Sequence, residues 1–291
     1  MLKKITIIGM VLLLAFSGIT ITATEPELPD LIITEIVADN ASSDVFEYIE
    51  IFNASGRTID LYDYSIAYVA DLTSASYNGP NKKTELVSGN FSTSLVDRSR
   101  AFDNPSEFLL SPGDVVLIWF WNFDSYEARA TISDFRAYYD LSDDVRVVAI
   151  DADNSAATGN PDRFNLQNSG YRGICIVESN FTPNSGYDDV ISMATLDYGK
   201  IQPSMPDLAV VYGKPVKAEE KWRLNMTAFW IEPTPGYLTE AQKLEFDVGA
   251  GSTDSNTAAP TFDKLPKVIF TILCVSAALV FVFSSKRRIE R

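Results

Sequence analysis

Two glutamates, Glu35 and Glu50, stand among apolar residues in two stretches that read as neighbouring β-strands. Paired carboxylates can hydrolyse glycosides, at a separation of about 5 Å for retention or about 6.5–9.5 Å for inversion. The alternative is that each carboxylate accepts hydrogen bonds from backbone, Arg or Lys groups at the end of a strand. Histidine is absent from the sequence, which excludes Ser-His-Asp and Cys-His catalysis and His-ligated zinc.

A second candidate is the acidic loop Asp151-Ala152-Asp153-Asn154-Ser155, with Asp162 farther on. Loops rich in carboxylate and carbonyl oxygens bind Ca²⁺. An EF-hand needs Gly at its sixth position and Glu at its twelfth, where this chain has Ala156 and Asp162. The loop is therefore a candidate for a looser calcium site on Asp151, Asp153 and Asp162, or a solvated turn. We expect no other cofactor.

A third candidate is the aromatic group Trp119, Trp121, Phe123 and Tyr126. Exposed aromatic rings anchor partners, but the position of these rings directly after a turn that starts a strand favours packing in the core. Five Asn-x-Ser/Thr sequons are potential glycosylation sites: Asn40, Asn53, Asn90, Asn180 and Asn225.

The sequence predicts the strands that position the two glutamates. Leu31–Val37 is a short run rich in β-branched residues, which is typical of a strand. Phe46–Tyr68 is a β-rich run, a polar turn at Asn53–Gly56 and a second β-rich run. Alternation along the first run leaves neither face wholly polar, so we expect this strand inside a sheet rather than at its edge. Ser133–Tyr139 is expected to form one or two helical turns.

Several motifs follow one another along the chain: Ile33-Thr34-Glu35-Ile36, Tyr48-Ile49-Glu50-Ile51-Phe52-Asn53, Ile59-Asp60-Leu61, Tyr64-Ser65-Ile66, the Pro112-Gly113 turn before an apolar strand, Leu166-Gln167-Asn168-Ser169-Gly170 and Pro233-Thr234-Pro235-Gly236. In their order these motifs resemble the lamin-tail domain family. The resemblance covers residues 30–237 and implies an all-β, immunoglobulin-like β-sandwich, non-enzymatic in the family at large, in which both glutamates occur without catalysis.

One segment departs from that family pattern. Residues 69–107 insert a long, mostly polar loop between strands, and loops longer than about 12–15 residues are often functional or disordered. We expect deletion of Leu72–Arg100 to leave the fold intact and to abolish binding.

The two ends predict export and anchoring. Residues 1–23 have Lys3 and Lys4, then an apolar run, as in a signal peptide. Residues 267–285 form an apolar stretch long enough for a transmembrane helix, followed by a basic tail at 286–291 that indicates the cytoplasmic side. Residues 238–266 read as a flexible stalk. We expect a single-pass type I protein of the cell membrane with its N-terminal domain outside.

Charge and cysteine content limit the partners. Without the ends, 17 Lys and Arg stand against 38 Asp and Glu, a charge near −21. Such a surface disfavours nucleic acid and anionic lipid. Cys175 and Cys274 fall on opposite sides of the predicted membrane boundary and cannot pair, so Cys175 is expected to be a buried, inert thiol.

The sequence therefore favours a non-enzymatic binding or adhesion module at the cell surface, with an extracellular protein or glycan as partner. The insertion and the Asp151 loop are the expected contact region. Two alternatives remain open: a structural envelope protein that self-associates, and a hydrolase that uses Glu35 and Glu50.

Overall fold

The structure, a computed structural model, places most of the chain between residues 27 and 248. The predicted signal peptide, membrane helix, basic tail and residues 249–266 of the stalk lie outside the described residues. Within the described part, no helix is long and apolar enough to cross a membrane. The described residues are 27–39, 45–86, 89–91, 102–122, 130–152, 164, 166–167, 169–197, 207–215, 220 and 222–248.

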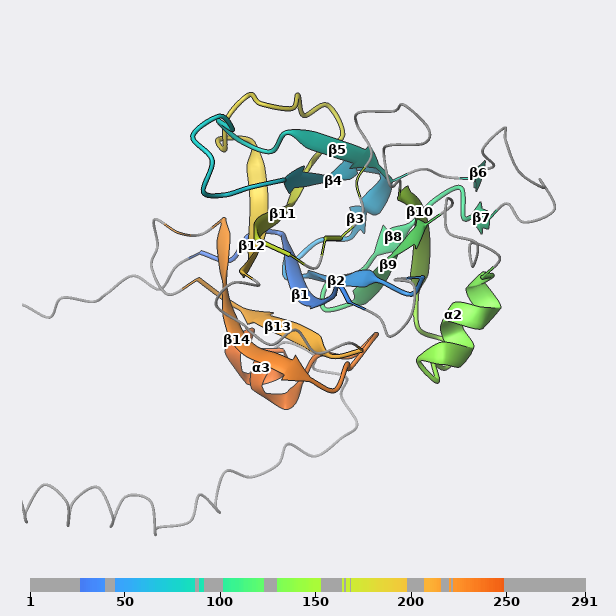
Figure 1. Cartoon of the computed structure of the whole chain (residues 1–291). Coiled ribbons are helices and arrows are strands. Elements are labelled where there is room, and N and C mark those ends of the chain that lie inside the picture. The colour runs from blue at the N-terminus through green and yellow to red at the C-terminus, as the bar shows by residue number, and fades with distance from the viewer. Residues whose placement is uncertain are drawn as a thin grey trace, which may run out of the picture. The chain divides into compact units, whose positions relative to one another are not determined.

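The prediction of an all-β fold is confirmed, because strands dominate and the helices are short (Figure 1). The elements are β1 Leu31–Val37, β2 Tyr48–Asn53, β3 Ile59–Asp60, η1 Leu61–Asp63, β4 Tyr64–Val69, β5 Lys82–Glu85, β6 Gly89–Phe91, β7 Phe102–Asn104, β8 Leu109–Leu110, β9 Val115–Asn122, α2 Ile132–Tyr138, β10 Val147–Ala152, β11 Tyr171–Glu178, β12 Val190–Asp197, β13 Ala209–Gly213, β14 Arg223–Ile231 and α3 Glu240–Glu245.

Ten of these strands form one sheet in the order β10-β9-β2-β1-β13-β14-β12-β11-β4-β5. The junction between β14 and β12 is short, with Arg223 and Leu224 beside Met193 and Ala194. The sheet folds back there, so that β1 lies against β12 and β11, and β10 lies against β5. The result is a β-sandwich made from one continuous sheet.

The core lies between the two layers. A single apolar cluster joins Ile33 and Ile51 from one layer with Ile66, Ile174 and Ile176 from the other. All six residues of β2 are buried, and β2 pairs with β1 on one edge and β9 on the other. The prediction that this strand lies inside the sheet is confirmed.

The outer face of the β9-β2-β1-β13 layer is also covered. The aromatic side of α2 packs there, with Phe135 near both Trp119 and Tyr48. Beyond α3, Phe246 stacks on Phe52 with 5.3 Å between ring centroids. Residues 233–237, which we call the closing turn, also reach this face through hydrogen bonds to β1 and β2.

The first part of the insertion is docked on the sandwich, which argues against the expectation that its deletion leaves the fold intact. Its strand β5 extends the sheet beside β4, and Leu86 is buried. Asn184 donates its backbone N–H to the Pro80 carbonyl at 2.8 Å, and the Lys83 ammonium donates to the Ser179 carbonyl at 2.6 Å. Deleting Leu72–Arg100 would therefore remove an edge strand and buried contacts.

The expected boundary between domain and stalk at residue 237 also needs correction. Helix α3 lies beyond that boundary and has a capping box at its start, between Thr239 and Gln242. Gln242 and Phe246 are both buried. Six residues are too few to form a stable helix alone, so these tertiary contacts hold α3, and the ordered domain continues to Val248.

Candidate functional site

A β-bulge in β1 brings the two glutamates together. Ile33 pairs with Ile51 across β1 and β2, but Glu35 pairs with Glu50, so Thr34 is an extra residue in β1. In a regular strand without the bulge, Glu35 would share the inner face with Ile33, because successive side chains alternate between faces. The bulge turns Glu35 to the outer face, directly opposite Glu50.

Glu35 binds the closing turn. Its Oε2 accepts hydrogen bonds from the backbone N–H of Thr234 at 3.0 Å and from Thr234 Oγ1 at 2.9 Å. The Tyr48 hydroxyl donates to Oε1. Burial raises the pKa of Glu35, although these hydrogen bonds act in the opposite direction.

Glu50 binds the same turn two residues farther along. Its Oε2 accepts the backbone N–H of Gly236 at 2.8 Å, and its Oε1 accepts from Thr34 Oγ1 at 2.7 Å. Burial, followed by the nearby charge of Glu35, raises the pKa of Glu50 to about 8. A buried carboxyl pair of this kind favours the uncharged form of at least one member at neutral pH.

The pair is therefore a fastening for the closing turn. Each glutamate is only 1% exposed, and both carboxyl groups are bonded to the closing turn. The hydrogen-bond donors are backbone and hydroxyl groups, whereas the sequence also suggested Arg or Lys. We call this arrangement of Glu35, Glu50, Thr234 and Gly236 the glutamate clasp.

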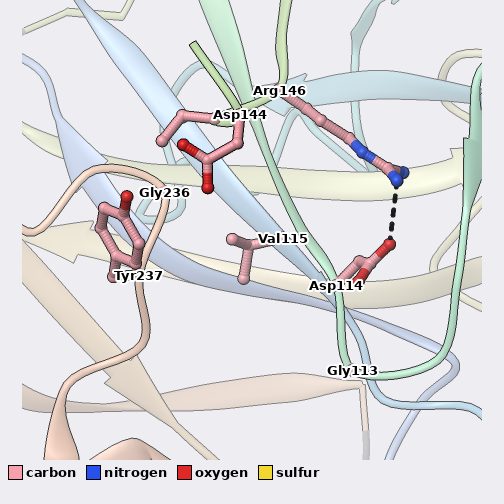
Figure 2. A pocket seen from close by; sticks show the side chains of 8 residues that line it. Gly113, Asp114, Val115, Asp144, Arg146, Gly236 and Tyr237 are labelled. Carbon is pink, nitrogen blue, oxygen red and sulfur yellow. Dashed lines mark ion pairs between the residues drawn. The ribbon is translucent and has the colours of Figure 1, made fainter. Parts of the chain in front are cut away.

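An open cleft of about 290 Å³ lies next to the clasp. Figure 2 shows the residues that line it. Gly236 belongs to both, because its N–H faces Glu50 while the residue also lines the cleft. The remaining lining residues come from the Pro-Gly turn before β9, the start of β9, the turn before β10 and the closing turn: Gly113, Asp114, Val115, Asp144, Val145, Arg146 and Tyr237.

The walls of the cleft differ in chemistry. Figure 2 shows Asp144 and Tyr237 on one side, the Arg146–Asp114 pair on the other, and Val115 between them. Arg146 Nη2 lies 3.2 Å from Asp114 Oδ2. The Tyr237 side chain is half exposed, and its hydroxyl lies 2.9 Å from Ser142 Oγ.

Ser142 connects the two groups of the first wall. Its hydroxyl donates to Asp144 Oδ1, and this hydrogen bond is the main cause that lowers the pKa of Asp144. Because the only proton of Ser142 is used there, the Tyr237 hydroxyl must donate to Ser142 Oγ. A carboxylate and an aromatic ring are thus held beside each other.

The other predicted site residues are spread over the fold. Asp151 belongs to β10, while Asp153 and Asp162 lie outside the described residues, so the calcium site stays a prediction. In the ranges that the structure covers, no three metal-binding side chains gather. Trp119 and Trp121 are buried, which confirms core packing for these two, whereas Phe123 and Tyr126 lie outside the described residues.

The structure also shows where Cys175 and two of the sequon asparagines lie. Cys175 is buried, and burial raises the pKa of its thiol, which confirms an inert cysteine. Asn53 is buried and its amide donates to the Leu110 carbonyl at 2.8 Å, so it is a structural residue of the turn after β2 rather than a glycan acceptor. Asn180 is exposed.

The fold and the clasp define an all-β sandwich closed by its own C-terminal turn. The chain belongs to the Lamin Tail Domain family, whose model matches residues 24–177. The match agrees with the resemblance found from the motifs, and it indicates no catalytic family.

Two further likenesses accompany the family match. The chain is 30% identical over 221 residues to the uncharacterized protein YvnB of Bacillus subtilis (strain 168), covering 74% of this chain but only 14% of that protein. A crystal structure of a DUF4876 family protein from Bacteroides thetaiotaomicron matches 75% of this chain and 76% of its own, with 11% identity and a TM-score of 0.40. This second likeness is too distant to support an argument.

Sequence reasoning missed the cleft. Asp144, Arg146 and Tyr237 come from separate turns, and no spacing in the sequence connects them. The available signal was the pair of Pro-Gly turns at residues 112–113 and 235–236, since both mark places where the backbone must turn sharply.

Proposed function

We propose that this chain is a non-enzymatic binding or adhesion module, displayed outside the cell on a single-pass C-terminal anchor. In this proposal the sandwich is immunoglobulin-like, and its turns and loops contact an extracellular protein or glycan. The observation that carries the proposal is the commitment of Glu35 and Glu50 to the closing turn, since it removes the carboxylate pair on which a hydrolase function depended.

The anchoring half of the proposal rests on the composition of the chain ends. An apolar stretch at 267–285 followed by a basic tail is the arrangement expected of a type I span. On intact cells, added protease should cleave the domain while a cytoplasmic protein survives, and removal of residues 267–291 should release the domain into the medium. Protection of the domain on intact cells would overturn this half.

The binding half is tested by presenting the full chain to an array of cell-surface glycans and proteins. Specific retention of at least one ligand class is expected. A hydrolase would instead turn over glycosides, and turnover lost in Glu50→Gln at unchanged stability would favour that alternative. The closing turn supplies the matched control, since Thr234→Val weakens the same clasp without touching Glu50.

Self-association is a second candidate because of the outer edge of β14. Only Arg223 and Leu224 pair with β12, and in the described part of the chain no strand covers that edge farther along. Met226 and Phe229 are 38% and 56% exposed there. Exposed apolar strand edges are templates for pairing with another chain. A strictly monomeric full chain at high concentration would count against this candidate.

A further inference from the structure

Two carboxylates, Asp114 and Asp144, and one guanidinium, Arg146, line the cleft beside the clasp, and the charges balance only when Arg136 behind the lining is included. Asp114 forms an ion pair with Arg146 on one wall of the cleft. Asp144, on the wall with Tyr237, has its pKa lowered mainly by the hydrogen bond from Ser142, and the Arg136 guanidinium contributes to this shift. Arg136 is fixed behind the turn by donating to the Ser142 and Val145 carbonyls at 2.8 and 2.7 Å.

This balance argues against an ionic ligand. An anion would face the carboxylates of Asp114 and Asp144, and a cation would face Arg146 and, behind the turn, Arg136, so neither gains a large net attraction inside the cleft. The site offers many hydrogen-bonding groups of both kinds instead. Asp144 and Asp114 provide acceptors, and Arg146 provides donors beyond the one that it gives to the Leu109 carbonyl at 2.6 Å.

The cleft also has an apolar part. Val115 forms the middle of the lining, and the half-exposed ring of Tyr237 stands at one side (Figure 2). Ligand sites combine apolar surface with a few placed polar groups, usually in about 300–1,000 Å³. A cleft of about 290 Å³ therefore has room for a single small ring rather than a long chain.

The groups that line the cleft are held in place before any ligand arrives. Tyr237 is fixed through Ser142, and Gly236 is fixed by its hydrogen bond to Glu50 at 2.8 Å. Fixed groups lose little conformational entropy on binding. The side chains can therefore form a specific, if weak, site.

We propose that this cleft binds one uncharged sugar ring of a glycan. The apolar C–H face of the sugar packs on Tyr237 and Val115, and its hydroxyl groups bond to Asp144, Asp114 and Arg146. The inference rests on the proposed binding function and names the ligand class of that function. A single ring in an open cleft should bind with a Kd on the order of 1 mM.

The test uses the full chain in a zwitterionic detergent, because glycoside detergents would compete for the cleft. Saturation-transfer NMR measures binding of glucose, galactose, mannose and N-acetylglucosamine, each also as a trisaccharide. Glucuronic acid and lysine serve as charged probes. At least one uncharged sugar should bind, and neither charged probe should compete with it.

Three variants locate the site. Tyr237→Ala should weaken sugar binding by about tenfold or more, while Tyr237→Phe, which keeps the ring, should stay within about threefold. Leu244→Ala is the control, because Leu244 is an apolar residue of α3 that is 84% exposed and lies outside the cleft lining. It should leave binding unchanged.

The outcomes separate this inference from the proposed function. If sugars bind but Tyr237→Ala has no effect, the cleft is not the site, although the binding function stands. If only charged probes bind, or a neutral peptide takes the cleft instead, the ligand class is wrong. If no sugar binds at 20-fold above the expected Kd, about 20 mM, the inference is overturned.

Discussion

Glu50 accepts a hydrogen bond of 2.8 Å from the backbone of Gly236, a residue 186 positions farther along the chain. This bond joins the centre of the sheet to its closing turn. The neighbouring contact from Thr234 to Glu35 spans 199 positions and does the same for β1. The two glutamates and the closing turn, which lie far apart in the sequence, therefore form one structural unit.

The first prediction concerns pH. The pKa of Glu50 is raised from 4.5 to about 8 in the folded state, so the folded chain binds more protons than the unfolded chain between those values. The associated stability is complete below about pH 4.5 and is lost as the pH rises through 8. Between these pH values the free energy of unfolding should fall by up to about 1.4 kcal/mol per pH unit. Urea unfolding at a series of pH values from 5 to 9 measures it.

Glu50→Gln isolates this effect, because glutamine resembles the uncharged acid. Its carbonyl oxygen can accept from Gly236, and its amide can donate to Thr34 Oγ1. We expect near-native stability at pH 5 and a flatter decline toward pH 9. Glu240→Gln, an exposed substitution, controls for the loss of one negative charge. An equal decline in both variants would show that surface repulsion, and not the clasp, causes the pH dependence.

The second prediction concerns Gly236. Its φ is +88°, and a Cβ at this position would lie 2.6 Å from a methyl carbon of Val145. Gly236→Ala should therefore lower the free energy of unfolding by about 2–4 kcal/mol, from the left-handed backbone and the overpacking together. Gly56→Ala is the control, because nothing lies within 4 Å of that position. Similar effects in both variants would contradict the proposed fit of the closing turn.

Local patterns in the sequence predicted the strands well. Leu31–Val37 is β1 as expected, since β-branched residues pack well on a pleated, buried surface. Ser133–Tyr139 corresponds to α2, which has a capping box between Thr131 and Asp134. These elements carry their own signals, so a single stretch of sequence suffices to find them.

The features that depend on distant partners could not be predicted. The bulge at Thr34 is defined only by pairing with β2, and Glu35 would have been placed on the wrong face without it. The second β-rich run expected within Phe46–Tyr68 is interrupted, because Asp60 accepts the Tyr62 N–H and starts the 3₁₀ turn η1. The cleft likewise depends on turns that meet only in the folded chain.

The third prediction tests whether the insertion is docked. Gly79 has φ +129°, and a Cβ there would collide with the Gly186 carbonyl oxygen. Gly113 also has a left-handed φ, +83°, but a Cβ added to it would meet no atom within 4 Å. Gly79→Ala should therefore be more destabilising than Gly113→Ala by about 1–3 kcal/mol. Thermal unfolding of the two variants measures this difference, because Gly79→Ala adds a steric clash and Gly113→Ala adds only backbone strain.

Equal losses for Gly79→Ala and Gly113→Ala would mean that the loop moves aside and is not packed against the turn at Gly186. The expected difference would instead confirm that residues near Gly79 belong to the sandwich. Any search for binding residues in the insertion should then begin beyond Leu86, which is itself buried.

The last prediction concerns Gln242 and the true end of the domain. Its amide nitrogen donates to the carbonyls of Thr34 and Tyr212, both at 2.8 Å, and its oxygen accepts from Thr239. Gln242→Ala would leave two buried carbonyls without these donors and remove the capping box. We expect a loss of roughly 2–4 kcal/mol in the free energy of unfolding.

Glu240→Ala is the matched control on the same helix, because its side chain is 88% exposed and its pairing with Lys243 is a surface contact. That change should alter stability by no more than about 0.5 kcal/mol. Urea unfolding of the full chain measures both variants. If Gln242→Ala were as mild as the control, α3 would not be held by β1 and β13, and the domain would end at the closing turn. The expected contrast places Gln242 among the residues that hold the bulge and, through it, the two glutamates.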